Sequence, residues 1–73
     1  MDTGKKIGML LRQKREEKGY SLSQVGEIMG RNKSTIYYYE TGRISIDVFN
    51  LEKLCHVYGT DLYTFIDEVK GMK

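Results

Sequence analysis

The sequence lacks most of the features that mark secreted and membrane proteins. It contains a single cysteine, Cys55, so no internal disulfide can form. The apolar residues around Cys55 predict a buried, reduced thiol, which is typical of an intracellular protein. No apolar run approaches the ~20 residues that a membrane-spanning helix requires, and the N-terminus lacks the charged and then apolar layout of a signal peptide. We therefore expect a cytoplasmic protein with no membrane partner.

The chain also has little capacity for an interior. Its 73 residues predict one domain over residues 1–73, with a core from about residue 5 to residue 70. A domain of this size buries only ~60% of the surface that its unfolded chain exposes. Little room is left for an enclosed active site, so we expect a binding protein that uses its outer surface, and not an enzyme.

Proline is absent, and glycine provides the breaks between segments. Gly19, Gly30, Gly42 and Gly59 separate stretches in which apolar residues recur at helical, not alternating, spacing. We predict a compact all-α fold with no strand and five helices, at about residues 5–18, 21–29, 32–41, 47–58 and 61–70. The link between the second and third helices is only three or four residues long, which allows a helix-turn-helix crossing.

The starts and faces of these segments support the prediction. Ser21 and Gln24 form the sequence pattern of a capping box. Gly26 lies inside the second helix, where glycine costs ~1 kcal/mol against alanine, so we expect another backbone to approach it closely. The other predicted N-caps are Asn32, Asp47 and Asp61. The apolar stripes predicted to form the core are Ile7, Leu10 and Leu11; Leu22, Val25, Ile28 and Met29; Val48, Leu51, Leu54, Cys55 and Tyr58; and Leu62, Phe65, Ile66 and Val69.

Three consecutive tyrosines in the third helix divide between its two sides. Each residue of a helix advances by ~100°, which places Tyr39 and Glu40 on the inner side with Ile36. Tyr37 and Tyr38 point the other way. The outward face is predicted to carry Lys33, Ser34, Tyr37, Tyr38 and Thr41.

This outward face offers hydroxyl groups, two amphipathic rings and a cation at its N-terminal end, with no acid. Helix N-termini attract phosphate through their exposed amides, and the major groove of B-DNA admits one helix. Residues 1–46 hold nine basic and five acidic residues, whereas residues 47–73 hold three and five. This asymmetry favours a polyanion partner. The alternative is ordinary solvated charge, with the tyrosines contacting a protein.

Two stretches, IGMLLRQKREEKGYSLSQVGEIMG and RNKSTIYYYETGRIS, resemble the Cro/repressor-type helix-turn-helix domains of the Xre family. The resemblance covers about residues 7 to 69. The residues that match the family pattern are the small residue Gly26, the turn glycine Gly30, the aliphatic Ile36, and Glu40-Thr41-Gly42 at the end of the third helix. It implies a five-helix, lambda-repressor-like fold whose second and third helices form the helix-turn-helix. It also implies a DNA-binding transcription regulator, either a repressor or a small phage-type switch.

The resemblance also implies roles for individual residues. It assigns Lys33, Ser34 and Tyr38 to base-reading positions and Tyr37 and Thr41 to flanking positions. Tyr37 is a base-contact candidate with the first three. Phosphate contacts are expected at the start of the second helix and around the end of the third. The candidates there are Ser21, Ser23, Thr41, Arg43 and Ser45. Arg12 and Arg31 are further phosphate candidates on charge grounds, with plain solvation as the alternative.

Members of the family often pair an arginine late in the first helix with the glutamate that ends the third. Those positions are Arg15 and Glu40 here. Both lie on core-facing stripes, so we expect an inward ion pair with a structural role. Removing one partner of a buried pair can cost ~3–5 kcal/mol. The alternative is a partly exposed ion pair that contributes little to stability.

Three positions depart from the family pattern. Leu22 occupies a site where glutamine is common, and Ile46 stands where many members have proline. The outward face of the third helix has no glutamine, asparagine or arginine beyond its cap, so it lacks the residues that make bidentate contacts to adenine or guanine. A tyrosine hydroxyl can reach one base edge or a phosphate, and its ring can touch a thymine methyl group.

The resemblance implies a homodimer on double-stranded DNA, with a palindromic operator whose half-sites lie ~34 Å apart. Phe49, Tyr63 and Ile66 are candidates for the dimer patch, and completing the core is the alternative for each. A protein-interaction or antitoxin-like module using the same tyrosine face is the alternative function.

The sequence suggests no metal, cofactor or small-molecule site. Cys55 and His56 are adjacent, and neighbours on a helix diverge by ~100°, so they are poorly placed to hold one metal ion together. No base and orienting group accompany the thiol, so we expect no catalytic residue.

Overall fold

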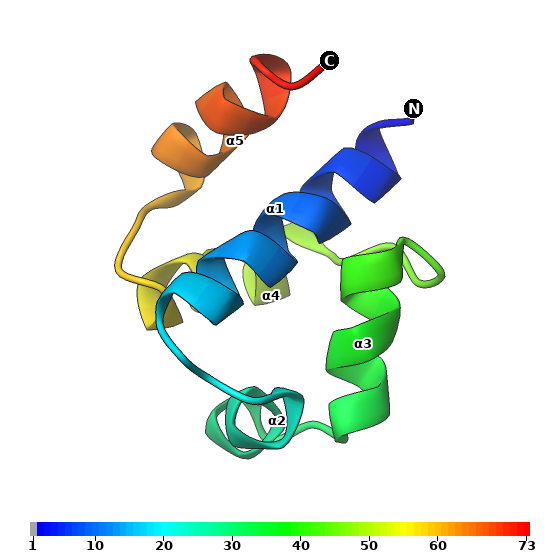
Figure 1. Cartoon of the computed structure of the whole chain (residues 1–73), viewed down its shortest axis with the longest axis vertical. Coiled ribbons are helices and arrows are strands. Elements are labelled where there is room, and N and C mark those ends of the chain that lie inside the picture. Colours follow the sequence, from blue (N-terminus) through cyan, green and yellow to red (C-terminus); the bar gives the residue numbers. More distant parts are fainter. Residues whose placement is uncertain (1) are drawn as a thin grey trace.

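Five α-helices account for most of the chain in a computed structural model that describes residues 2–73. They are α1 (Thr3–Glu17), α2 (Leu22–Met29), α3 (Lys33–Thr41), α4 (Val48–Val57) and α5 (Leu62–Lys70) (Figure 1). No strand occurs between residues 2 and 73. The predicted all-α, five-helix architecture is therefore confirmed.

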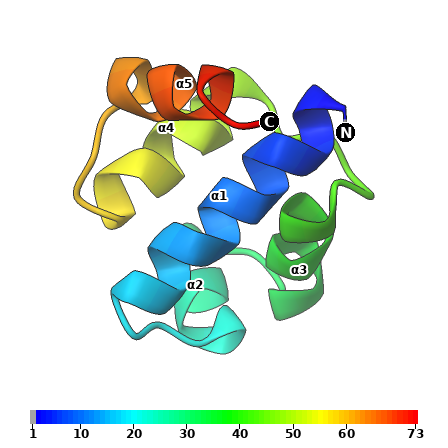
Figure 2. The same ribbon diagram turned by 45° about the horizontal axis from the view of Figure 1, so that its top comes forward.

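Helix α1 runs through the middle of the molecule (Figure 2). It contacts α3 on one side and α5 on the other, while α2 packs against α3 and α4 against α5. Two polar contacts fasten α5 and the chain end to α1. Lys14 forms an ion pair of 3.0 Å with Glu68, and the Lys6 ammonium donates to the carbonyl of Met72 at 3.2 Å. Within residues 2–73, no helix combines the length and the apolar character needed to cross a bilayer.

Side-chain caps define where the helices begin. Ser21 accepts from the Gln24 amide at 3.0 Å while the Gln24 side chain accepts from the Ser21 amide at 2.8 Å, so the predicted capping box is confirmed. Asp47 and Asp61 each accept a backbone amide at 2.8 Å, as predicted. Helix α1 begins two residues earlier than predicted, because Asp2 caps it by accepting from the Lys5 amide at 2.8 Å.

Glycine ends both helices of the predicted helix-turn-helix. Gly30 follows α2 with φ 66°, and Gly42 follows α3 with φ 76°. Both lie in the left-handed region of backbone conformation, where residues other than glycine are strained. These two residues therefore stop α2 and α3 at the lengths that the sequence predicts.

Two further glycines bring α3 into backbone contact with its neighbours. A Cβ atom on Gly26 would lie 2.8 Å from the carbonyl oxygen of Arg31, which confirms the predicted close approach within α2. The second is Gly8 of α1, which the sequence analysis missed. A Cβ atom there would overlap the carbonyl oxygen of Glu40 and lie 2.7 Å from that of Tyr39.

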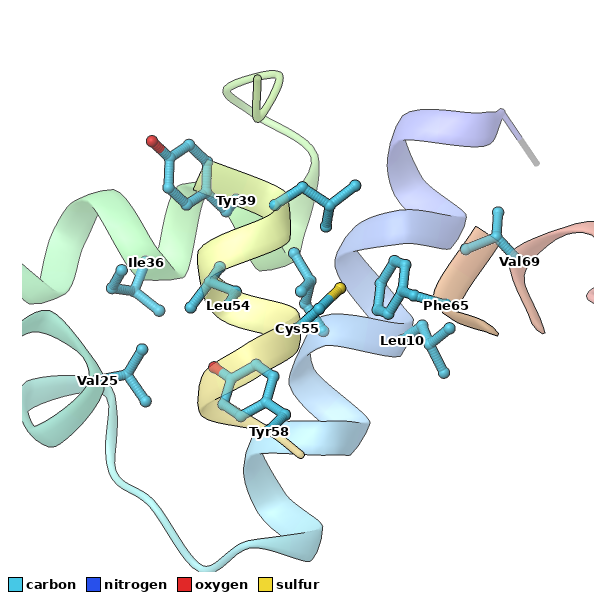
Figure 3. Close-up of a cluster of buried hydrophobic side chains, with 11 residues drawn as sticks. Leu10, Val25, Ile36, Tyr39, Leu54, Cys55, Tyr58, Phe65 and Val69 are labelled. Atoms are coloured by element: carbon cyan, nitrogen blue, oxygen red, sulfur yellow. The ribbon is translucent and has the colours of Figure 1, made fainter. Parts of the chain in front are cut away.

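The core draws on all five helices and lies mainly around α4 (Figure 3). Its buried members are Leu10, Leu11, Val25, Ile36, Tyr39, Leu51, Leu54, Cys55, Tyr58, Phe65 and Val69. Two predicted core residues, Ile28 and Val48, are instead exposed. Ile28 lies ~60° beyond the arc of α2 that carries Val25 and Met29. Val48 is the first residue of α4, at the edge of its buried stripe.

The Gly8→Ala substitution tests the contact between α1 and α3. We expect a loss of ~1–3 kcal/mol in the free energy of unfolding, because the added methyl group overpacks a backbone contact. Gly71→Ala is the matched control, since a Cβ there meets its nearest atom at 3.5 Å and the backbone is right-handed. Urea unfolding measures both, and equal stabilities for the two variants would show that α1 and α3 are not in close contact.

Candidate nucleic-acid interface

The turn between α2 and α3 is built by backbone hydrogen bonds. The Arg31 amide donates to the Gly26 carbonyl at 2.8 Å, and the Thr35 amide donates to the Asn32 carbonyl at 3.0 Å. Asn32 is the N-cap of α3, as predicted, but its side chain makes no capping hydrogen bond. The turn therefore depends on main-chain contacts and on the absence of a side chain at Gly26.

Helix α3 presents the outward face that its periodicity predicts. Ile36, Tyr39 and Glu40 are buried. Figure 3 shows the Ile36 and Tyr39 side chains on the core side of α3, facing α4. Tyr37 is about half exposed, and Tyr38 is intermediate. The other outward residues, Lys33, Ser34 and Thr41, are exposed.

The two outward tyrosines form a small cluster with Arg43. Their ring centroids lie 6.0 Å apart with the planes tilted by 56°. The Arg43 guanidinium lies 5.1 Å from the centroid of the Tyr38 ring, which is within the range of a cation–π contact. Gly42 turns the chain so that the Arg43 amide donates to the Tyr38 carbonyl at 3.0 Å. The loop after α3 thus folds back onto the outward face.

A hollow of about 350 Å³ lies on this face. Its wall contains no acidic side chain, and cations lie along it at Lys33 and Arg43. The lining residues are Leu22, Lys33, Ser34, Tyr37, Tyr38 and Arg43. Leu22 was not predicted as a site residue. The sequence feature that could have indicated this role of Leu22 is an apolar side chain at the first position of α2, where the family that the sequence resembles often has glutamine.

The remaining phosphate candidates lie at different places around this hollow. Ser23 and Arg31 line an adjoining hollow of about 610 Å³, which includes Lys33 but also the acidic Glu27. Arg12 lines a third, smaller hollow beside Tyr37.

Three candidates have other local partners. The Ser21 hydroxyl oxygen accepts the capping hydrogen bond of α2, and the Thr41 hydroxyl donates to the Tyr38 carbonyl at 3.3 Å. Arg12 lies 3.5 Å from Glu16 in an exposed pair. Ser45 is exposed and lines a separate hollow beside Ile7 of α1.

The Arg15–Glu40 ion pair fastens the end of α3 to α1. The guanidinium binds both carboxylate oxygens, at 2.7 and 3.1 Å, and also donates to the Tyr20 carbonyl at 2.9 Å. The Arg15 and Glu40 side chains are only 12% and 4% exposed. The hydrogen bonds that Arg15 donates to Glu40 raise the pKa of Arg15 above its ordinary value, so the guanidinium keeps its charge. The pair points inward, as expected.

The buried cysteine is a poor nucleophile. Burial raises the pKa of the Cys55 thiol to about 11, which keeps the thiol protonated and poorly nucleophilic at neutral pH. Burial also raises the pKa of Tyr58, with a further contribution from the nearby Glu40 carboxylate. Across residues 2–73, no three histidine, cysteine, aspartate or glutamate side chains cluster as a metal site requires.

The three dimer-patch candidates differ in their exposure. Phe49 of α4 and Tyr63 of α5 are 76% and 84% exposed, so neither completes the core. Ile66 is partly buried and packs against the core cluster. Two of the three therefore remain available to a partner, and Ile66 has at least a partial role in the core.

A family model for the helix-turn-helix domain matches residues 6–63. The chain therefore belongs to the helix-turn-helix domain family. Relatives from Saccharolobus islandicus and Saccharolobus solfataricus, provisionally named HTH-type transcriptional regulatory proteins, are 36% and 35% identical over 66 residues. These matches cover 88% of this chain and 21% of each relative. The chain thus spans about a fifth of the length of these relatives.

A solved structure supports the fold independently. The crystal structure of the clp gene regulator ClgR from C. glutamicum is similar with a TM-score of 0.89, over 97% of this chain and 91% of that chain. The sequence identity is 24%, so this likeness concerns the arrangement of the helices.

The Glu40→Gln substitution tests the buried ion pair. We expect the free energy of unfolding to fall by ~3 kcal/mol or more, because the Arg15 guanidinium stays buried without a countercharge. Glu16→Gln is the matched control, since the exposed pair of Glu16 with Arg12 should contribute less than ~1 kcal/mol. Urea unfolding at neutral pH measures both variants. Similar small losses in the two would contradict a structural role for the buried pair.

Proposed function

We propose that this chain is a sequence-specific, double-stranded DNA-binding domain that inserts α3 into the major groove. The supporting observation is the outward face of α3, which belongs to a helix-turn-helix domain and carries no acidic side chain. Cations lie near both ends of this face, at Lys33 and Arg43. The groove is ~12 Å wide and admits a single α-helix.

Different residues would read bases and hold the backbone. Lys33, Ser34, Tyr37 and Tyr38 would approach base edges, because they lie on the outward side of α3. Arg43 would contact phosphate beside them. The further phosphate contacts would come from Ser21, Ser23, Arg31, Arg12 and Thr41. The Ser21 hydroxyl can still donate to a phosphate, because its capping hydrogen bond uses only an oxygen lone pair.

The proposal extends to the assembly and its biological role. The chain would act as one domain and bind a palindromic operator as a two-fold dimer, with half-sites ~34 Å apart. The exposed Phe49 and Tyr63 side chains are the candidates for the contact between copies. The dimer would act in the cytoplasm as a transcriptional repressor or a phage-type switch.

Selection from a random duplex pool, followed by binding measurements at several salt concentrations, tests the proposal. Affinity for the enriched duplex should fall steeply with salt, in proportion to the phosphates neutralised. Arg43→Ala should weaken binding to all duplexes and reduce the salt slope by ~1. Tyr38→Ala should change the order of preferred sequences and leave the slope unchanged. Lys53→Ala, an exposed cation on α4, is the control that should change neither.

Failure of different measurements would have different meanings. If no duplex is enriched at moderate salt, the proposed function is wrong and a protein partner for the tyrosine face becomes the better hypothesis. If Tyr38→Ala weakens binding equally on every duplex, Tyr38 contacts the backbone and does not read bases.

A further inference from the structure

We infer that the hollow between α2 and α3 recognises the C5-methyl groups of thymine, so that the preferred half-site is defined by methyl positions more than by hydrogen bonds. This inference rests on the proposed function and specifies what the same face reads. The inference is based on Leu22, Tyr37 and Tyr38, which form the apolar part of the hollow.

The outward face has few side chains suited to the commonest form of direct readout. Bidentate contacts to adenine or guanine come from asparagine, glutamine or arginine, or from lysine on guanine. Between residues 33 and 41, Lys33 is the one residue of these types. Each tyrosine has one hydroxyl, and the Ser34 side chain also has one, so α3 has few hydrogen-bonding groups with which to distinguish four base pairs.

The apolar surface of this face comes from two rings and one aliphatic side chain. The two rings are tilted by 56° and do not stack flat, and Leu22 adds an aliphatic side chain from α2. The thymine methyl is the distinctive apolar group on the base edges of the major groove. The apolar part of this hollow, on a helix in that groove, therefore has one chemical counterpart there.

Arg43 adds charge to this arrangement. Its guanidinium lies 5.1 Å from the centroid of the Tyr38 ring, within the range of a cation–π contact. Lys33 and Arg43 give the lining of the hollow a positive charge, with no acid to oppose it. This charge favours a nucleic acid over an apolar peptide as the occupant.

The direct test changes the DNA and leaves the protein intact. In the enriched duplex, each thymine is replaced singly by uracil, which removes the methyl group and keeps the O4 acceptor. Burial of one methyl group corresponds to about fourfold in affinity, so we expect about a fourfold loss at one or more positions. At the same positions, 5-methylcytosine should bind about fourfold more tightly than cytosine. Fluorescence anisotropy measures each dissociation constant.

Protein variants locate the methyl contacts. Tyr37→Phe and Tyr38→Phe keep the rings and should keep the preference for thymine over uracil. Tyr37→Ala, Tyr38→Ala and Leu22→Ala should each abolish that preference at the position that the side chain contacts. Circular dichroism identifies any variant that has lost its helices, and the DNA substitutions on the unaltered protein do not depend on these variants.

The outcomes separate this inference from the proposed function. A duplex that is bound selectively but tolerates uracil at every position would overturn the inference and leave the proposed function standing. A preference for thymine that survives all three alanine variants would overturn the assignment to this hollow. Failure to enrich any duplex would overturn the proposed function itself, and with it the inference.

Discussion

The ion pair between Arg15 and Glu40 sets the rotation of α3 about its own axis. Glu40 lies on the inner side of α3, and the guanidinium holds both of its carboxylate oxygens against α1. Because helical residues advance by ~100°, fixing one side chain inward fixes which side chains point outward. Tyr37 and Tyr38 face away from the core for this reason. Charge, burial and backbone geometry therefore combine at one contact to define the candidate interface.

The closeness of that contact depends on small residues as much as on charge. Gly8 lets the α3 backbone approach α1, and Gly26 lets the turn before α3 approach α2. Helix α3 is thus held at both ends, by the turn at its N-terminus and by the ion pair at its C-terminus. The loop beyond it returns across Gly42 and places Arg43 over Tyr38. The short helix that carries the candidate interface is therefore supported from several directions.

Local signals in the sequence were sufficient to predict the helices and the two sides of α3. Helix caps such as Ser21, and the glycines that end helices, depend on a few neighbouring residues. The helix ends can therefore be predicted without knowing the fold. The contact at Gly8 was missed because its cause is the backbone of a helix more than thirty residues away in the chain. The cation–π contact of Arg43 with Tyr38 was missed for a similar reason, since it depends on the path of the loop. Ile28 was placed in the core because periodicity gives an apolar face but not how much of that face a neighbour covers.

We propose that the outward face of α3 is the surface that meets DNA. Backbone amide chemical shifts of the isotope-labelled protein, recorded while a selected duplex is added, test this most directly. We expect the largest changes at residues 33–38, with further changes at Leu22 and Arg43. Largest changes around Phe49 of α4 or Tyr63 of α5, with α3 unaffected, would contradict it.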